Sequence, residues 1–377
     1  MRLRLCTFNV ENLYNRFDFA ALSDETQARY VGQIKDLLGA FDGGDFTRFP
    51  EFRRLVATLR KSEDDVKRTQ TAGVMAEGGA HLYVLQEVDS FEALDRFTDR
   101  FLSPATGETF DTRVLLEGND TRGIDVAALS VSGVPIYSRS HARLMAEALG
   151  RSDSAERLLQ AYPRARAQQA LAALRGGRVF RRDCLELVLP LNGTEITVFA
   201  CHFKSMAGGS DDAGLGVRQL EAIAVREIIS RKFPDPARAL WAICGDLNDA
   251  RTHRIVSPHR GPDGVFAEEC VALSPSGATE SGIDPLFQDG FGIDLGQSLP
   301  DAERWSHYYA PARSKAQLDY IIASPALAQC LSSAPRFVRS GQPLRVPNTE
   351  GIARLDSIGW DRPKASDHCP LVVEFQI

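Results

Sequence analysis

Polar side chains stand at the ends of several apolar runs in this sequence. The run "AICGDLND" ends in Asp246 and Asn248, and the run "TVFACHFKS" delivers His202 and Lys204. Strands commonly finish in glycine and aspartate simply to turn, so one such end is weak evidence of a site. The pattern recurs in "FNVEN", "HLYVLQEV", "QLDYI" and "SDHCPL". Those four runs add Asn9, Glu11, Gln86, Glu87, Asp319, Asp367 and His368.

Carboxylates and amides that converge from several strand ends are the ligands that a hard divalent cation requires. Each residue also has an ordinary structural interpretation. Asn9 and Asp367 could cap turns, and Glu87 could be an exposed strand end. His202 could be a histidine satisfied within a sheet, and Asp319 could pair with an arginine. Their occurrence together in one chain favours a metal-dependent site.

Cysteines near these polar groups raise the alternative of a zinc centre. Cys6, Cys201, Cys244 and Cys369 all lie within three residues of one of them. Side chains alternate along a strand, so Cys201 should face away from His202. The chain also has no CxxC or HExxH spacing. Buried cysteines that act as small apolar residues are the favoured interpretation.

The elements that must position the polar groups are strands spread over the whole chain. The apolar runs that predict strands cover 2–9, 81–86, 124–131, 184–191, 195–203, 238–245, 317–323 and 369–376. Apolar residues at three- to four-residue spacing predict a helix over 212–232. Residues 50–66 form a helix candidate, and 141–175 should hold one or two helices. The Gly/Pro-rich stretches 257–285 and 339–351 indicate long surface loops.

Composition places the chain among ordinary globular proteins. It has 377 residues, of which 44% are hydrophobic and 25% charged, and its net charge is −6. No apolar run approaches the ~20 residues that span a membrane, and the first residues lack a secretory signal pattern. Seven cysteines without paired spacing fit reduced thiols in a cytoplasm. The negative charge argues against a broad phosphate-binding surface. We therefore expect one cytoplasmic domain over 1–377, built on a large mixed sheet.

Seven motifs in order, "FNVENL", "LQEV", "RGIDVAAL", "CHFKS", "GDLND", "LDYI" and "SDHCPL", resemble the endonuclease/exonuclease/phosphatase superfamily. The chain looks most like the bacterial branch that carries "HFKS" and "RGIDVA". The resemblance extends from Asn9 to Phe375. It implies an α+β protein with the four-layer αββα sandwich of the deoxyribonuclease I-like type and a site at one edge. Segments 20–75 and 141–175, which vary in this superfamily, would shape substrate access.

The resemblance also implies a metal site. Asn9, Glu87 and Asp367 match metal ligands, and Glu11 stands where some members have an acidic neighbour of the metal. Mg²⁺ suits so few protein donors because it prefers oxygen ligands and keeps several waters. Mn²⁺ could replace it and tolerates histidine better, and Ca²⁺ is a further candidate.

The remaining motif residues match the groups that handle water, phosphate and protons. Asp246 and Asn248 correspond to the pair that holds the attacking water and the phosphate. His368 resembles the catalytic histidine that faces the scissile phosphate, with Asp319 as the carboxylate that orients it. His202 matches a second histidine near the leaving group, although the sequence offers it no obvious carboxylate partner.

The predicted activity is divalent-metal-dependent hydrolysis of a phosphodiester, with DNA or RNA as substrate and Arg122 and Lys204 as phosphate contacts. Trp305, Tyr308 and Tyr309 of "RWSHYYAP" could stack on bases, or could pack within a loop. The first alternative is a phosphatase or diesterase of a small molecule or lipid headgroup, built on the same core. The second is a phosphate-binding module without catalysis. No obligate protein partner is expected.

Overall fold

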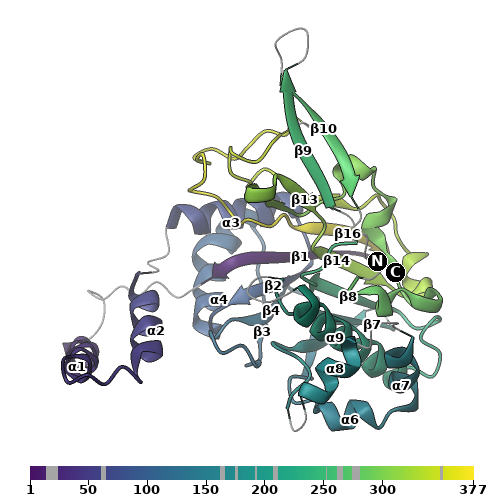
Figure 1. Ribbon diagram of the computed structural model, residues 1–377. Coiled ribbons are helices and arrows are strands. Elements are labelled where there is room, and N and C mark those ends of the chain that lie inside the picture. Colours follow the sequence, from purple (N-terminus) through teal and green to yellow (C-terminus); the bar gives the residue numbers. More distant parts are fainter. Residues whose placement is uncertain are drawn as a thin grey trace.

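Two mixed six-stranded sheets lie face to face at the centre of the computed structural model (Figure 1). The residues that the structure describes are 1–13, 24–60, 65–161, 166–174, 177–191, 193–206, 211–251, 253–260, 266–273, 281–348 and 351–377. The first sheet has, in spatial order, β15 (Arg336–Phe337), β16 (Leu371–Gln376), β1 (Arg2–Leu13), β2 (Leu82–Val88), β4 (Asp125–Ser130) and β3 (Thr112–Leu115). The second has β11 (Ile293–Asp294), β14 (Asp319–Ala323), β8 (Trp241–Asp246), β7 (Thr194–His202), β6 (Cys184–Leu191) and β5 (Tyr137–Ser140).

Helices cover the outer face of each sheet, which gives four layers (Figure 1). Those on the first sheet are α3 (Asp65–Gly78), α4 (Phe91–Phe97), the π-helical turn η2 (Thr98–Leu102) and α5 (Ser103–Thr106). Those on the second are α6 (Ala146–Gly150), α7 (Asp153–Gln160), α8 (Arg166–Ala173) and α9 (Asp211–Lys232). The predicted αββα sandwich is confirmed, whereas the interpretation as a single domain stays a prediction.

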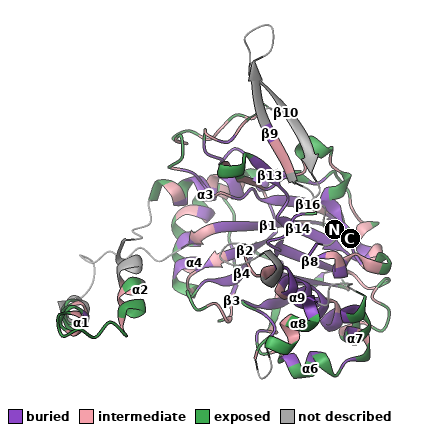
Figure 2. Cartoon of the chain, viewed as in Figure 1, coloured by how far each residue is buried: buried purple, intermediate pink, exposed green. Residues whose placement is uncertain are grey.

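Alternation along β7 shows how the sequence builds two cores. Val198 and Ala200 lie in the core between the sheets, while Phe199 and Cys201 lie in the core under the helices. A strand places successive side chains on opposite faces, so His202 continues the inward-facing set. Most residues of the central strands are buried (Figure 2), and alternate residues of β7 belong to two different core clusters. Cys201 faces away from His202, as the alternation predicts.

A smaller sheet rises from the edge of the sandwich. It consists of β10 (Phe266–Leu273), β9 (His253–Arg260), β13 (Ser314–Ala316) and β12 (His307–Tyr309). The prediction of a surface loop over 257–285 is therefore wrong for its first part, because β9 and β10 form an antiparallel hairpin with Ile255 opposite Val271. Glycine and proline suggested a loop, whereas the pairing of the flanking residues determines the structure here. Residues 339–348 and 351 form no helix or strand, as expected.

The helical predictions need two corrections. The described part of 141–175 contains three short helices rather than one or two. The helix predicted over 50–66 is α2 (Phe49–Arg60), which ends earlier, and residues 61–64 lie outside the described part. The helix predicted over 212–232 is confirmed as α9. A long helix that the sequence did not reveal, α1 (Asp24–Asp42), precedes α2.

The remaining elements are short. They are α10 (Pro325–Ala328), η4 (Asp284–Leu286), η5 (Gln288–Gly290), η6 (Leu295–Ser298), η7 (Asp301–Glu303) and η8 (Ala310–Ala312). Within the described residues, no helix combines the length and apolar character needed to cross a membrane.

Candidate active site

Three polar residues lie side by side at one edge of the second sheet. His202 ends β7 and Asp246 ends the parallel strand β8, and the register places the two residues opposite each other. Asp319 begins β14, which runs antiparallel to β8, and it too lies opposite Asp246. The apolar residues of each strand fix the register, so the polar end residues of three strands must meet here. All three are buried.

A matching row lies at the same edge of the first sheet. Asn9 on β1 is in register with Gln86 on β2, and Glu87 follows at an irregularity in the pairing with β4. Glu87 has a φ of 68°, which turns the carboxylate out of the regular alternation of the strand. Asp367 precedes β16, the neighbour of β1 on its other side. The three predicted metal ligands thus come from β1, β2 and the loop that leads into β16.

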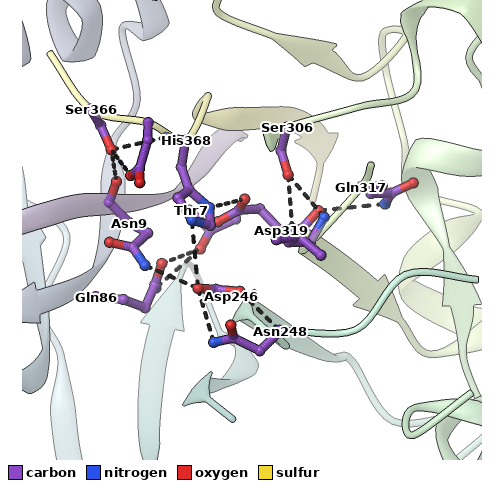
Figure 3. Close-up of polar contacts among 12 residues, drawn as sticks. Thr7, Asn9, Gln86, Asp246, Asn248, Ser306, Gln317, Asp319, Ser366 and His368 are labelled. Atoms are coloured by element: carbon purple, nitrogen blue, oxygen red, sulfur yellow. Dashed lines mark hydrogen bonds and ion pairs between the residues drawn. The ribbon is translucent and has the colours of Figure 1, made fainter. Parts of the chain in front are cut away.

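Two hydrogen bonds join the rows across the gap between the sheets (Figure 3). Asn9 Nδ2 donates to Asp246 Oδ2 over 2.9 Å. His368 Nδ1 lies 2.7 Å from Asp319 Oδ2. Both contacts are buried, where charge-assisted hydrogen bonds have their greatest strength. The predicted pairing of His368 with Asp319 is present, and the site spans both sheets.

The loop that carries His368 is held by a set of side chains around it. Ser366 Oγ donates to the Asn9 carbonyl over 2.7 Å and accepts the His368 backbone N–H over 3.0 Å. Gln342 Nε2 donates to the His368 carbonyl over 2.8 Å. On the opposite side, Ser306 Oγ accepts the backbone N–H of Asp319 over 3.0 Å. These contacts fix the imidazole with Nε2 3.9 Å from Asp246 Oδ2.

Asp246 and Asn248 form a compact turn after β8. The Asn248 backbone N–H donates to Asp246 Oδ1 over 2.8 Å, and Asn248 Nδ2 donates to Asp246 Oδ2 over 3.1 Å. Asn248 Nδ2 also donates to the Phe203 carbonyl over 3.1 Å. Asn248 has a φ of 49°, a conformation that asparagine tolerates better than most residues. The "GDLND" run is therefore a turn and part of the site at once.

Burial and mutual repulsion perturb the acidic groups. Burial raises the pKa of Asp246 to about 7, with His368 opposing the shift and Asp319 adding to it. Burial also raises the pKa of Glu87, helped by Asp367 and opposed by His368 and Arg122. Carboxylates held close together out of water attract a cation or a proton.

The two site histidines differ in charge preference. Burial opposes protonation of His368, but the carboxylates of Asp319 and Asp246 raise its pKa well above the ordinary value. Burial, with Arg182 and Arg122 nearby, lowers the pKa of His202 well below the ordinary value. The surroundings thus favour the protonated form of His368 and the neutral form of His202.

His202 has carboxylates near it, but none at hydrogen-bond distance among the described residues. Its Nε2 lies 3.7 Å from Asp246 Oδ2 and 4.0 Å from Glu87 Oε1. Its Nδ1 is buried without a hydrogen-bond partner in the described part of the chain. The structure therefore does not give His202 the carboxylate that Asp319 gives His368.

The two predicted phosphate contacts lie on the His202 side of the site. Arg122 is half exposed and pairs through NH2 with Asp120 Oδ2 over 2.9 Å. Lys204 Nζ donates to the Ser205 carbonyl over 2.9 Å. Burial lowers the pKa of Lys204, and the charges of Arg182 and Arg218 lower it further. Several cations therefore lie close together on this side of the site.

Glu11 takes a different position from the other acidic residues. Its Oε2 lies 2.9 Å from Lys364 Nζ, and its Oε1 lies 3.4 Å from Arg362 NH2. Lys364 and Arg362 lie in the loop before β16 and neutralise Glu11. These ion pairs tie that loop to β1.

His307 is a site residue that the sequence did not reveal. It lies on β12 and forms an isolated β-bridge with His368. The two rings lie 5.0 Å apart at their centroids, inclined by 47°. Burial, with His368 nearby, lowers the pKa of His307 to about 4. Its strand is only three residues long and lacks an apolar run, so the sequence carried no signal beyond the aromatic cluster around it.

The aromatic residues around His307 have separate environments. Trp305 is 1% exposed and lies under the Arg339 guanidinium, 4.4 Å from the ring centroid. Tyr309 is 55% exposed. Packing within a loop is therefore the correct interpretation for Trp305, and Tyr309 retains an accessible ring.

Comparison with known proteins supports the fold. No model of a protein family matches the chain, and no curated protein matches it. The crystal structure of an endonuclease/exonuclease/phosphatase from Bacteroides vulgatus matches with a TM-score of 0.50 at 11% sequence identity, over 100% of this chain and 99% of that one. The chain has the endonuclease/exonuclease/phosphatase fold.

Two further structures resemble the chain less closely by TM-score. An AP endonuclease from Leishmania major matches with a TM-score of 0.48 at 14% identity, over 100% of this chain and 88% of that one. A family protein from Leptotrichia buccalis C-1013-b matches with a TM-score of 0.46 at 12% identity, over 100% of both chains. The predicted bacterial branch stays a prediction.

In this endonuclease/exonuclease/phosphatase fold, the donor set at the site edge fits a divalent cation. Ligand atoms of Asp246, Asp319 and His368 lie within 4.8 Å of one another, as do those of His307, Asp367 and His368. Neither group contains a cysteine. The cysteines named as a zinc alternative are all buried, as expected of small apolar residues. Carboxylate oxygens with one or two imidazoles, and no thiolate, fit a divalent cation other than a cysteine-bound zinc.

Proposed function

We propose that this protein is a divalent-metal-dependent phosphodiester hydrolase that acts on nucleic acid. The supporting observation is the double row of polar residues at one edge of the sandwich, joined by the Asn9–Asp246 and Asp319–His368 hydrogen bonds. Hydrolysis of a phosphodiester needs an aligned water, neutralised phosphoryl charge and a stabilised leaving oxygen. The two rows contain candidates for all three tasks.

Asn9, Glu87 and Asp367 would hold the metal ion. They come from β1, β2 and the loop before the neighbouring β16, and the Asp367 carboxylate raises the pKa of Glu87, so the two acids lie near each other. When bound, Mg²⁺ or Mn²⁺ would polarise the phosphoryl group and stabilise its developing charge.

Asp246 and Asn248 would orient the attacking water. Their turn fixes the Asp246 carboxylate by hydrogen bonds from Asn9 and Asn248. His368 would donate a hydrogen bond from Nε2 to the scissile phosphate, because Asp319 already engages Nδ1. His202 would serve the leaving oxygen as the second histidine. Two imidazoles suit a diester, because hydrogen bonds from them can stabilise both the phosphoryl oxygens and a poor alkoxide leaving group.

Nucleic acid is the proposed substrate because cations gather on one side of the site. Arg122 and Lys204 would contact phosphates next to the scissile one. The solved relatives include an AP endonuclease, although at 14% identity. The net charge of −6 limits the number of phosphate contacts, so we expect a shallow salt dependence of binding.

The metal requirement is tested with the purified protein after chelation. Cleavage of a short oligonucleotide should be lost, and addition of Mg²⁺ or Mn²⁺ should restore it, with Ca²⁺ as a third trial. Asp246→Asn should remain inactive with any metal. His81→Ala is the matched control, because His81 precedes β2 at the end opposite Glu87, about 20 Å away along the strand. Full cleavage in excess chelator would contradict the proposal.

The substrate class is tested by comparing kcat/KM across plasmid DNA, single-stranded DNA, RNA, a chromogenic diester and a sugar or inositol monophosphate. We expect the nucleic acids to exceed the monophosphates by at least tenfold. The opposite preference would support the alternative, a phosphatase or diesterase of a small molecule or lipid headgroup with the same metal-dependent core.

A further inference from the structure

His307 is fixed by the backbone beside the loop that carries Asp367 and His368. Its strand β12 pairs with β13, so His307 lies opposite Ala316. On its other side it bridges His368, and the backbone N–H of Cys369 donates to the Ser306 carbonyl over 2.7 Å. Pairing on both sides holds the backbone of His307 beside this loop.

The ring of His307 faces metal-ligand atoms rather than a structural partner. A ring nitrogen of His307, a carboxylate oxygen of Asp367 and a ring nitrogen of His368 lie within 4.8 Å of one another. Among the described residues, the His307 ring forms no hydrogen bond or ion pair, and its ring contact is with His368. A half-buried imidazole without a hydrogen bond is unusual, because polar groups withdrawn from water are normally satisfied.

The other two members of the group differ in the hydrogen bonds that they already make. His368 Nδ1 is engaged by Asp319, and its Nε2 faces Asp246. Among the described residues, the side-chain hydrogen bond to the Asp367 carboxylate is a long one from Ser366 Oγ, 3.5 Å from Oδ1. His307 and Asp367 are therefore the pair with donor atoms available for an ion, and His368 remains available to substrate.

We propose that His307 and Asp367 together ligate the divalent cation of the active site, which gives this protein a preference for Mn²⁺ over Mg²⁺. The inference rests on the metal site of the proposed function and adds a nitrogen donor to its oxygen ligands. Imidazole binds first-row transition ions well, whereas Mg²⁺ prefers an all-oxygen shell. Two donors that each lie about 2.1 Å from one ion are at most about 4.2 Å apart. The separation of up to 4.8 Å between these donor atoms is close to that limit.

The experiment measures metal binding to the full chain without turnover. Calorimetric titrations with Mn²⁺ and with Mg²⁺ compare the wild type with His307→Phe, which keeps the ring against His368 but removes the donor. Mn²⁺ affinity should fall by at least ~10-fold, while Mg²⁺ affinity should change by less than about threefold. His307→Gln, which offers an amide oxygen in place of the ring nitrogen, should also lower the preference for Mn²⁺ over Mg²⁺. His81→Phe should leave both affinities unchanged.

Electron spin-echo spectroscopy of bound Mn²⁺ identifies the ligand directly. The wild type should show nitrogen modulation from a coordinated imidazole, and His307→Phe should lose it. Retention of the modulation in His307→Phe, with its loss in His368→Phe, would overturn the inference and make His368 the ligand. Mn²⁺ binding without nitrogen modulation in the wild type would overturn this inference and leave the proposed function standing. Absence of any Mn²⁺ or Mg²⁺ binding would overturn the proposed function with it.

Discussion

Gly245 lies on β8 directly before Asp246 and opposite Cys201 of β7, which makes Gly245→Ala an informative substitution. Its φ is 147°, and a Cβ built on it would lie 1.8 Å from the Cys201 carbonyl oxygen of β7. Real Cβ atoms essentially never approach closer than 3.0 Å, so β7 and β8 would have to separate by about 1.2 Å. The displacement would fall one residue away from both site groups.

Two costs contribute to the expected loss of stability. An alanine in a conformation that favours glycine costs about 1–3 kcal/mol. Overpacking against a backbone atom adds about 1–3 kcal/mol. Gly133→Ala is the matched control, because Gly133 also has a positive φ, 83°, but no atom lies within 4 Å of the added Cβ. The control should carry only the conformational cost.

Urea unfolding of both variants gives the free energies, and initial rates at a temperature where both are folded give the activities. Gly245→Ala should lose about 2–6 kcal/mol and lower kcat/KM by ~100-fold, the scale of a 1 Å displacement of catalytic groups. Gly133→Ala should keep its activity. If Gly245→Ala proved no less stable and no less active than Gly133→Ala, the result would contradict the close contact of Gly245 with the Cys201 carbonyl.

Three further outcomes are expected. His368→Ala should lower kcat by at least ~100-fold with metal affinity nearly intact by calorimetry, since the imidazole is proposed to act on substrate. Asp319→Asn should cost less, because it removes charge and orientation only, and a larger loss than in His368→Ala would refute the pairing. Away from the site, hydrogen bonding by His141, opposed by burial and helped by Lys232, lowers the pKa of Glu186 to about 2. Because this pKa is lower in the folded chain, the stabilisation is present above the ordinary carboxylate value and is lost as the pH falls toward 2. The stability difference between wild type and Glu186→Gln, measured by urea unfolding, should therefore shrink from pH 6 to pH 4, and a constant difference would contradict the shift.

The sequence predicted the strands that carry the site because those strands are buried on both faces. Buried strands read as continuous apolar runs, and a polar residue that ends one is conspicuous, as Asp246 and Glu87 are. The order of the seven motifs along the chain then indicated the superfamily. Neither argument could supply the partner of Asp246 across the sheets, since the Asn9 contact joins residues 237 positions apart.

The parts that the sequence missed have weak local signals. His307 lies on a three-residue strand whose place depends on β13 and on the loop before β16. β9 contains Pro258, which suggested a loop, and its pairing with β10 depends on the complementary strand rather than on local composition. Non-local pairing of this kind overrides local propensity.

The division of the site between the two sheets has a consequence for folding. Asn9 comes from the first sheet and Asp246 from the second, so each sheet alone carries half of a site. The site is complete only when the two sheets have docked, whereas the far-UV signal comes from backbone pairing within each sheet. During refolding, far-UV circular dichroism should therefore recover before turnover does. Recovery of turnover during refolding therefore reports the docking of the two sheets.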